Sequence, residues 1–500
     1  MKQSLISLCL LPVFLISCSE TKKELKKDKG LVIFKKEIAD LNAYFRIPGM
    51  AVLVKRNDEI IYEDYLGYRD VEAKKRLDST TLFPIASITK VFTGITMMSL
   101  AEKGKISLDA PANDFFENEP FDKTVKVKHI LSHTSQGVPP GEKFYYSGRF
   151  GALTQIIESS SKTSFESAVQ QTILKPLKLK HTFFLKDSTS IAQRNESFAK
   201  PYIIDDGTKP GSVDYGFSTS AGLVTTARDL IKVDNTLDNN GLISEASKNQ
   251  MFSSFKNELP YGYGIFSEIF SGKKLVWAYG QYDCYSSLWV KVPSHDITLI
   301  LLANNNLMSD SARLIYGNAT SSLFVISLLK NLVFSNEEMP LLEETLGTAA
   351  KNSLLHRDKL RAQALAASFM AQFDIKELDI SKQLLLILFS QYPDYLEYTD
   401  LSLLHNLSFL KEVAFHRDLG EFRDFDDQIT TIGKHLLKKD PNNPYANYYL
   451  GSFYNKNGDF EKASKYFQQI VNARNFSKNW YTVEAQQWLE EHSKRSHQPK

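Results

Sequence analysis

The pattern of apolar residues changes once along this 500-residue chain, and the change limits what the chain can fold into. From about residue 31 to residue 334, β-rich runs alternate with stretches of helical periodicity, whereas from about residue 337 onward the pattern is almost wholly helical. A chain of 500 residues also exceeds the size of one ordinary hydrophobic core. The sequence therefore predicts two folded domains, 34–335 and 336–500.

Strand-like runs lie at both ends of the first domain. Each end carries two runs joined by a short polar turn, which is the pattern of a β-hairpin. The four runs are Met50–Lys55, Glu59–Tyr62, Tyr285–Val292 and Asp296–Ala303. Hairpins at both ends with helices between them predict an α/β (α+β) fold, in which one antiparallel sheet is closed by its terminal hairpins and flanked by helices.

The second domain contains one segment with the spacing of a tetratricopeptide repeat, Asn447–Ile470. Its small residues Gly451 and Ala463 stand where the two helices of such a repeat approach closely. One repeat cannot bury its own apolar face, so neighbouring helices should stack on it. We expect an all-α, tetratricopeptide-like domain that serves either as a stability and spacer module or as the binding site of a protein partner.

The first 17 residues have the pattern of an export signal, with a positive Lys2 and an apolar stretch, Leu5–Ile16, that is too short to span a bilayer. Leu15-Ile16-Ser17-Cys18 resembles the lipobox of bacterial lipoproteins, in which the cysteine is acylated; the alternative is an ordinary signal peptide with an incidental cysteine. The resemblance implies an exported lipoprotein, anchored to a membrane through Cys18 on the periplasmic face or cell surface, with a lysine-rich tether over 18–33.

Composition excludes several classes of function. Lys+Arg 60 against Asp+Glu 58 gives a formal charge of +2, so no nucleic-acid partner is predicted. The histidines stand at spacings that do not suit a metal site, and the phosphate-loop and G-x-S-x-G patterns are absent from the sequence, so we predict no metal and no cofactor. Beyond Cys9 and Cys18 the only cysteine is Cys284, so no disulfide is expected.

Ser87-Ile88-Thr89-Lys90 places a hydroxyl and an amine one helical turn apart. The same offset recurs four times, at Ser159/Lys162, Ser253/Lys256, Ser271/Lys274 and Ser327/Lys330. Only Ser87 follows a strand-like approach and opens an apolar helix that runs to Gly104. Context, and not the spacing, therefore singles out this pair.

A serine at a helix N-terminus lies where free backbone N–H groups and the positive end of the helix dipole stabilise an oxyanion. Burial of Lys90 in the apolar helix should disfavour its charge, so that the amine can take the proton of Ser87. The alternative for an isolated pair is a serine that caps the helix, followed by a solvated lysine.

Segments around this pair follow one another in the order known from a single superfamily. They are Ile47–Gly49, Leu82–Lys90, Ala101–Asp109, Ile130–Ser135, Pro176–Leu177 and Ser220–Leu230. Together they resemble the serine β-lactamases, penicillin-binding proteins and related esterases over roughly residues 34–330. The resemblance implies a serine hydrolase that forms an acyl-enzyme at Ser87.

The family's second motif is Tyr-x-Asn, in which the tyrosine works with the lysine on protons and the amide holds the substrate. In Tyr145-Tyr146-Ser147-Gly148 the resemblance assigns the tyrosine position to Tyr146 and the asparagine position to Gly148, with Tyr145 as an alternative one residue out of register. A neighbouring cation should lower the pKa of the Tyr146 phenol. We expect His133 to have a structural role.

The third motif is normally Lys-Thr-Gly or His-x-Gly, which supplies a cation for a substrate carboxylate. Alignment on Gly280 puts Ala278 at the cation position and Tyr279 between the two, so the cation is missing while these residues still border the substrate. The N–H groups of Ser87 and Gln281 are the implied oxyanion hole. Recognition of the carboxylate of a penicillin or a cell-wall peptide is weakened by this change.

Two hypotheses follow. The first is a serine hydrolase of the esterase, DD-peptidase or β-lactamase type, which acts on an ester or an amide. Its substrate would be a small molecule or a peptide, and a peptide derived from the cell wall is one candidate. The second is a catalytically weakened lipoprotein that acts as a binding or assembly module through its helical domain. The altered residues Gly148 and Ala278 favour the second hypothesis, and the intact Ser87/Lys90 pair favours the first.

Overall fold

A computed structural model describes residues 18–335, 339–342, 353–394, 400–417, 423–473 and 479–495 of the chain. The predicted signal peptide lies outside these residues, as does part of the predicted domain boundary near residues 335–340. The predicted limits of the two domains therefore stay a prediction. We call the part up to residue 335 the sheet region and the helices that follow it the helical region.

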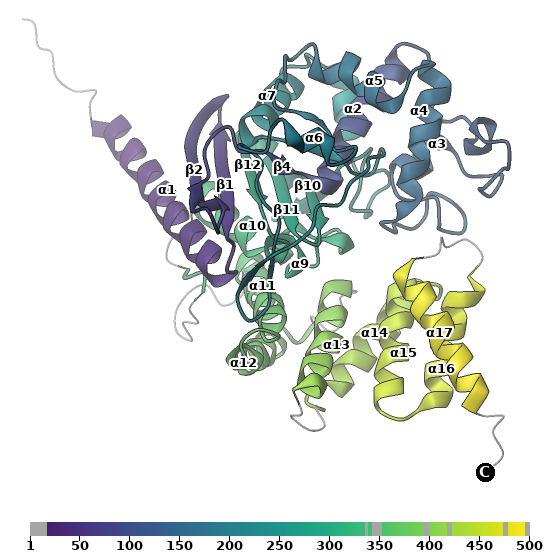
Figure 1. Ribbon diagram of the computed structural model, residues 1–500. Helices are drawn as coiled ribbons and strands as arrows, with labels where there is room; N and C mark the ends of the chain where they lie inside the picture. The colour runs from purple at the N-terminus through teal and green to yellow at the C-terminus, as the bar shows by residue number, and fades with distance from the viewer. Residues whose placement is uncertain are drawn as a thin grey trace, which may run out of the picture.

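The sheet region is built on a seven-stranded sheet with the order β3-β2-β1-β12-β11-β10-β9 (Figure 1). The strands are β1 (Gly49–Arg56), β2 (Glu59–Asp70), β3 (Lys75–Arg76), β9 (Phe266–Phe270), β10 (Lys273–Tyr282), β11 (Tyr285–Val292) and β12 (Ile297–Ala303). β1 pairs with β12 in an antiparallel register that sets Met50 opposite Ala303. The terminal hairpins thus close one antiparallel sheet, which confirms the predicted fold class.

Both hairpin turns follow from their residues. Asn57 and Asp58 join β1 to β2 with φ values of 49° and 64°. Positive φ at both positions is typical of the turns that match the twist of paired strands, and Asn and Asp tolerate it best after Gly. Between β11 and β12, a short 3-10 turn over Pro293–His295 ends on Asp296, whose φ is 45°.

Both faces of the sheet are covered. Along β1, Ala51 and Leu53 point into a core shared with α2 (Thr89–Glu102) and α7 (Ala227–Asp238), whereas Met50, Val52 and Val54 point into a second core. The second core includes residues of α1 (Cys18–Tyr44), α10 (Leu323–Leu328) and α11 (Leu354–Met370). Because side chains alternate along a strand, a strand covered on both faces is apolar throughout.

Shorter elements complete the sheet region. The helices are α3 (Val127–Leu131), α4 (Leu153–Ser161), α5 (Phe165–Val169), α6 (Thr189–Ala192), α8 (Glu245–Met251) and α9 (Leu307–Asp310). Two small sheets contain β4 (Phe83–Pro84), β5 (Phe183–Phe184) and β8 (Leu223–Thr225), and β6 (Tyr202–Ile204) with β7 (Thr208–Pro210).

The segment predicted as a tether is helical, because α1 begins at Cys18. Its C-terminal half packs on the sheet through Phe34, Ile38 and Leu41, which are fully buried. Glu37 of the same helix accepts a hydrogen bond from Ser327 at 2.7 Å and pairs with Lys330. None of the helices in the described residues has the length and hydropathy needed to cross a bilayer.

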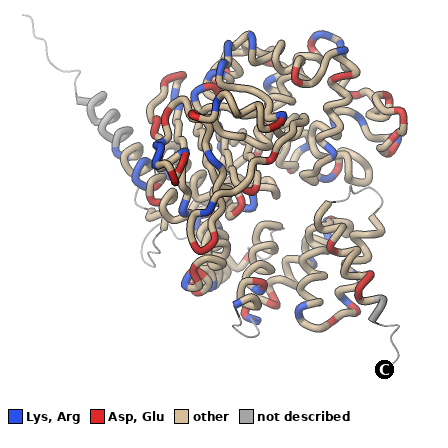
Figure 2. Tube along the Cα trace, viewed as in Figure 1, with Lys and Arg blue, Asp and Glu red and all other residues tan. Residues whose placement is uncertain are grey.

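The helical region stacks successive helices on one another. They are α11, α12 (Lys376–Gln391), α13 (Leu401–His416), α14 (Asp426–Lys439), α15 (Pro444–Lys456), α16 (Phe460–Asn472) and α17 (Trp480–Arg495). A Cβ on Gly451 of α15 would lie 2.7 Å from the Phe467 ring of α16. The predicted close approach of these two helices is confirmed. Figure 2 shows basic and acidic residues intermixed along the coloured part of the chain.

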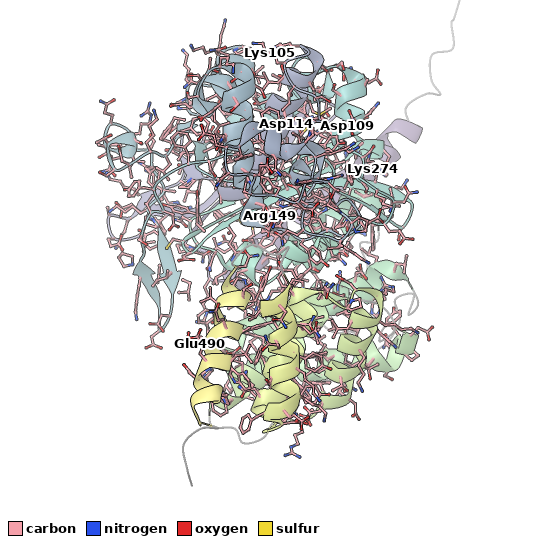
Figure 3. The ribbon with its side chains drawn as sticks, turned by 90° about the vertical axis from the view of Figure 1, so that its right-hand side faces the viewer. Lys105, Asp109, Asp114, Arg149, Lys274 and Glu490 are labelled. Atoms are coloured by element: carbon pink, nitrogen blue, oxygen red, sulfur yellow. The ribbon has the colours of Figure 1, made fainter. Side chains whose placement is uncertain are left out.

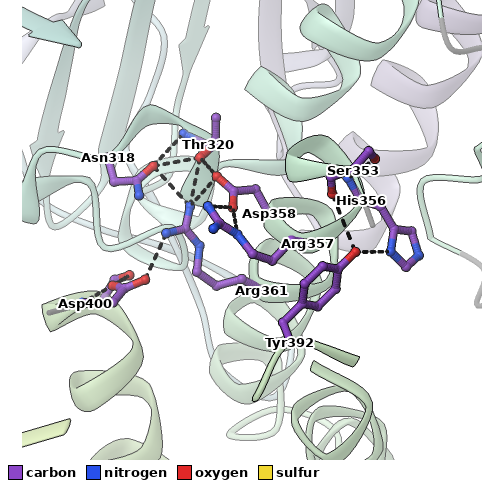
Figure 4. A network of polar contacts seen from close by, with 10 residues as sticks. Asn318, Thr320, Ser353, His356, Arg357, Asp358, Arg361, Tyr392 and Asp400 are labelled. Atoms are coloured by element: carbon purple, nitrogen blue, oxygen red, sulfur yellow. Dashed lines mark hydrogen bonds and ion pairs between the residues drawn. The ribbon is translucent and has the colours of Figure 1, made fainter. Parts of the chain in front are cut away.

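α11 belongs to both regions. Phe369 and Met370 pack in the core beneath the sheet, while Leu360 and Ala364 pack against α12 and α13. The guanidinium of Arg361 donates to Thr320 at 2.8 Å on one side and to Asp400 at 2.9 Å on the other (Figure 4). This helix therefore fixes the helical region against the sheet region.

Candidate active site

Ser87 lies where a short strand turns into a buried helix. β4 pairs with β8, and the Ile85 N–H extends this pairing by donating to the Leu223 carbonyl at 2.9 Å. Ala86 then turns the chain with a φ of 43°, and a single 3-10 turn over Ala86–Ile88 leads into α2. A left-handed alanine is strained, so this turn is held by its surroundings.

The amine of Lys90 lies against the hydroxyl of Ser87. Lys90 Nζ is 2.9 Å from Ser87 Oγ and donates to the Ser220 carbonyl at 3.0 Å. The lysine is 4% exposed, and burial lowers its pKa to about 7. An amine of this pKa is neutral in a large fraction of molecules at neutral pH, so it can accept a proton from a hydroxyl in contact with it. The structure therefore places the two residues as the S-x-x-K spacing predicted.

Tyr146 covers the same pair. Lys90 Nζ lies 4.8 Å from the centroid of the Tyr146 ring, and the phenol lies close enough to the Ser87 hydroxyl for that group to influence its pKa. The expected lowering of the Tyr146 pKa is wrong: burial raises it, and the nearby Ser87 hydroxyl offsets this only in part. The physical reason is that the buried phenol is removed from water, which disfavours the charged phenolate more than its polar neighbour stabilises it.

His133 supports Tyr146 from behind. Its ring stacks on the Tyr146 ring at 4.3 Å, and its Nδ1 accepts a hydrogen bond from the Ser147 N–H at 3.2 Å. Burial and the nearby charge of Lys90 hold the pKa of His133 well below its ordinary value, so the ring is neutral. This environment agrees with the structural role expected from the sequence.

The alternative residue Tyr145 points away from Ser87. Its hydroxyl contacts the carboxylate of Asp440, at the junction between α14 and α15. Of the two adjacent tyrosines, Tyr146 is the one that lies beside Ser87 and Lys90. The position of Tyr146 agrees with the in-register alternative, and its catalytic role stays a prediction.

Gly280 lets β10 run directly beside the Ser87 turn. A Cβ at this position would lie 2.1 Å from the Ile85 carbonyl oxygen and 2.4 Å from Ser287 Oγ, so only glycine is accommodated. Ser287 fixes the same carbonyl by donating to it at 2.9 Å. The close approach brings the strand that carries Gln281 next to the turn that carries Ser87, as the predicted oxyanion hole requires.

A cavity of about 390 Å³ opens beside Ser87. Its lining from the sheet region is Ser87, Tyr146, Tyr279, Gln281, Tyr282, Asp283, Asp310, Arg313, Leu314, Ile315 and Tyr316. Its lining from the helical region is His405, Tyr445 and Trp480. Aromatic side chains therefore dominate the walls, and they come from both regions of the chain.

The remaining predicted residues lie outside this lining. Gly148 begins a short 3-10 turn, and a Cβ there would meet no atom within 4 Å. Ala278 is 4% exposed and packs in the core shared with α2. The cavity does contain one guanidinium, that of Arg313, which pairs with Asp310 at 2.9 Å and stacks on Phe369.

The comparisons with known proteins agree with this geometry. A family model described as Beta-lactamase matches residues 34–319, more than half of the chain. The chain belongs to this family. It is therefore a member of the superfamily of serine β-lactamases and penicillin-binding proteins, as the ordered segments predicted.

Individual relatives of the family are distant. The match to Protein flp of Staphylococcus aureus (strain MW2) is 27% identical and covers 52% of this chain and 60% of that protein. A penicillin-binding protein of Bacillus subtilis (strain 168) is 24% identical over 55% of this chain and 72% of its own length. The match thus spans well under the full length of the Staphylococcus relatives.

A solved structure, the octameric penicillin-binding protein homologue from Pyrococcus abyssi, is 25% identical with a TM-score of 0.52 and covers 61% of this chain and 80% of that one. In the helical region, a model described as Tetratricopeptide repeat matches residues 433–463. This match overlaps the predicted repeat Asn447–Ile470 and confirms the tetratricopeptide-like character of the C-terminal part.

Some residues of the cavity were not foreseen. Ser220 stood in a segment that supported the family resemblance, yet its carbonyl contact with Lys90 depends on the backbone and leaves no sequence signal. His405, Tyr445 and Trp480 lie more than 300 residues beyond Ser87 in the chain, so no local pattern connects them to it. Within the described residues, no group of His, Cys, Asp and Glu side chains is arranged to hold a metal ion.

Proposed function

We propose that this member of the family is a serine hydrolase that acts through an acyl-enzyme on ester or amide substrates. The observation that carries the proposal is the 2.9 Å contact between Ser87 Oγ and the amine of Lys90, whose pKa burial lowers to about 7. Nucleophilic catalysis by serine needs a base in contact with the hydroxyl, and here the base lies three residues further on, in the buried helix α2 that follows the 3-10 turn of Ser87.

In the proposed reaction, neutral Lys90 accepts the proton of Ser87 while Ser87 Oγ bonds to the substrate carbonyl carbon. The N–H groups of Ser87 and Gln281 stabilise the negative charge on the carbonyl oxygen. Tyr146 stays protonated because burial raises its pKa, so it can donate to the leaving group and recover its proton from Lys90. The departing alcohol or amine leaves an ester on Ser87, which water then hydrolyses.

The site favours esters and simple amides over substrates that carry a carboxylate. Ala278, which is buried behind the cavity lining, supplies no cation where the family resemblance implies one, and the guanidinium of the lining, that of Arg313, is already paired with Asp310. A carboxylate that enters the site loses its hydration, and without a charged partner no ion pair compensates for this loss. Cell-wall peptides and β-lactams are second candidates for the substrate of this chain, because one relative is named as a penicillin-binding protein.

The test is covalent labelling of the full chain with a fluorophosphonate and with a fluorescent penicillin, followed by mass spectrometry. We expect an adduct with the fluorophosphonate on Ser87 that is absent in Ser87→Ala. No adduct with either reagent on the folded protein would favour the alternative, a binding or assembly module. Labelling that persists in Ser87→Ala would show that the site lies elsewhere.

The missing cation can be tested in the same assay. Ala278→His restores the family's residue at this position, so we expect penicillin to label the variant faster than the parent chain. An unchanged rate would show that this cation does not limit the reaction.

We further propose that the protein is an exported lipoprotein anchored through Cys18. Support comes from the sequence Leu15-Ile16-Ser17-Cys18 at the end of the apolar leader. Growth with an alkyne-labelled fatty acid should label the parent chain, whereas Cys18→Ser should carry no label. Equal labelling of both chains would overturn this assignment.

A further inference from the structure

The cavity beside Ser87 is closed on one side by the helical region. α13 contributes His405, α15 contributes Tyr445 and α17 contributes Trp480 to the same lining as Ser87 and Tyr146. In Figure 3, Arg149 of the sheet region lies on the side that faces these helices, and its charge acts on the Tyr481 phenol of α17. The helical region is therefore seated directly over the site.

Directional contacts hold this wall in place. Tyr316 of the sheet region is hydrogen-bonded to His405 Nδ1 at 3.0 Å and to the Tyr449 hydroxyl at 2.7 Å. The Tyr445 hydroxyl donates to the Tyr146 carbonyl at 3.3 Å. Tyr445 and Tyr449 are 5% and 4% exposed, so these bonds are shielded from water. Buried polar contacts of this kind fix one arrangement of the two regions.

Trp480 differs from the rest of the wall because it is 47% exposed. It is the first residue of α17 and makes edge contacts with the Tyr448 and Tyr481 rings, at 4.8 Å and 5.5 Å. A large ring that both lines the cavity and faces solvent stands at the mouth. Its bulk sets how large a group can extend out of the cavity.

We propose that the helical region is a wall of the substrate cavity and selects substrates by size, with Trp480 as the residue that limits the mouth. The inference rests on the proposed hydrolase function and adds a specificity role for helices α13, α15 and α17. A cavity of about 390 Å³ is near the lower end of the volumes that hold drug-sized ligands, so the residues at its mouth limit how large an acyl or leaving group can be.

The experiment compares hydrolysis of p-nitrophenyl acetate and p-nitrophenyl octanoate by the full chain, with Ser87→Ala as the background. We expect Trp480→Ala to raise the ratio of octanoate to acetate kcat/KM about tenfold, because one steric difference in an apolar pocket discriminates by at least this much. Trp480→Phe keeps a ring at the mouth and should give an intermediate ratio.

Phe460→Ala is the matched control. Phe460 is the first residue of the neighbouring helix α16, is 52% exposed and lies outside the cavity lining, so its removal should leave the ratio unchanged. Thermal unfolding followed by circular dichroism shows whether each variant keeps its fold.

The outcomes separate the two proposals. Ser87-dependent hydrolysis with the same ratio in Trp480→Ala and the parent chain would overturn the wall and leave the hydrolase intact. Equal changes in Trp480→Ala and Phe460→Ala would also overturn it, because the effect would then be a general loosening of the helices. If Ser87-dependent hydrolysis were absent for both esters, the proposed hydrolase function would be wrong, and so would the specificity role of the helical region that rests on it.

Discussion

Lys90 shows how a single residue acquires its chemistry from its surroundings. The amine contacts one hydroxyl and one carbonyl and lies over the rings of Tyr146 and Phe150, at 4.8 Å and 5.5 Å from their centroids. The two hydrogen bonds and the two rings replace only part of the hydration that an ammonium group has in water. The neutral form is therefore favoured, and the amine becomes a base at ordinary pH.

This environment predicts the pH dependence of the reaction. The pKa of Lys90 is about 7. When the pH is below this value, Lys90 carries its proton and cannot accept another from Ser87, so kcat/KM for p-nitrophenyl acetate should rise as the pH increases through it. Steady-state kinetics between about pH 5 and pH 9 would show the rise. Lys90→Arg, whose guanidinium stays protonated, should be inactive throughout this range. A flat profile for the parent chain would exclude Lys90 as the base.

The lowered pKa of Lys90 also makes the free energy of unfolding depend on pH, and the direction of this dependence follows from proton binding. The unfolded chain holds the lysine proton up to the ordinary pKa of 10.5, whereas the folded chain releases it from about 7. The unfolded state therefore binds more protons between these values, and the contribution of Lys90 to the free energy of unfolding rises with pH across this window.

At the residue scale, the sequence predicted what depends on local spacing. Ser87 and Lys90 are three residues apart where a 3-10 turn continues into α2, so their contact follows from local helical geometry. The pKa of Tyr146 was predicted in the wrong direction, because its burial depends on residues such as Tyr261 and Tyr279, which come from distant segments. Distances within a helix follow from the sequence, and the solvation of a side chain does not.

Among the elements, the segment 143–146 connects the site to the helices. Lys143 Nζ donates to the Lys439 carbonyl at 3.1 Å, and Tyr145 contacts Asp440, both at the end of α14. The next residue, Tyr146, faces Ser87. Two contacts on one side of the segment thus set the position of the phenol on the other.

We expect Tyr145→Phe to lower kcat by about 10- to 100-fold with little change in KM, because small displacements of a catalytic group have effects of this size. Steady-state kinetics on p-nitrophenyl acetate would separate the two constants. Tyr448→Phe is the matched control, since Tyr448 makes a similar contact with the carboxylate of Glu484 on the helical region's surface. A loss that appears in KM alone, or equally in both variants, would contradict a positioning role for Tyr145.

The elements themselves were largely predictable. Both hairpins and the Gly451 crossing depend on turn residues and small side chains within about 25 residues of one another, so their signals survive in the sequence. The docking of Asp440 at the end of α14 and of Tyr445 of α15 on segment 143–146 joins residues about 300 positions apart through individual hydrogen bonds. Nothing in the periodicity of either segment records such a contact.

For the whole molecule, Arg361 is a buried polar link between the two regions, in addition to the tyrosine contacts around the cavity. Its guanidinium is buried and bonded to Asp358, Asp400 and Thr320, which belong to α11, the start of α13 and the sheet region. A buried charge held by several partners is costly to remove, because the partner carboxylates then lack compensation.

We therefore expect Arg361→Met to lower the free energy of unfolding by about 3–5 kcal/mol. Urea denaturation would measure the loss. Lys465→Ala removes an exposed pair with Glu461, whose two side chains are 72% and 83% exposed, and should change stability by less than about 0.5 kcal/mol. If the two variants were equally stable, the Arg361 network would not hold the regions together.

The pairing of β1 with β12 joins a strand that is synthesised early to one that is synthesised much later. Met50 emerges from the ribosome long before its partner Ala303, and the α11 residues that cover one face of the sheet, such as Phe369, emerge later still. Strands that pair across such a distance fold slowly, and their apolar faces stay uncovered meanwhile. The nascent chain would thus expose a nearly continuous apolar strand for most of its synthesis, which makes it a natural client for a chaperone.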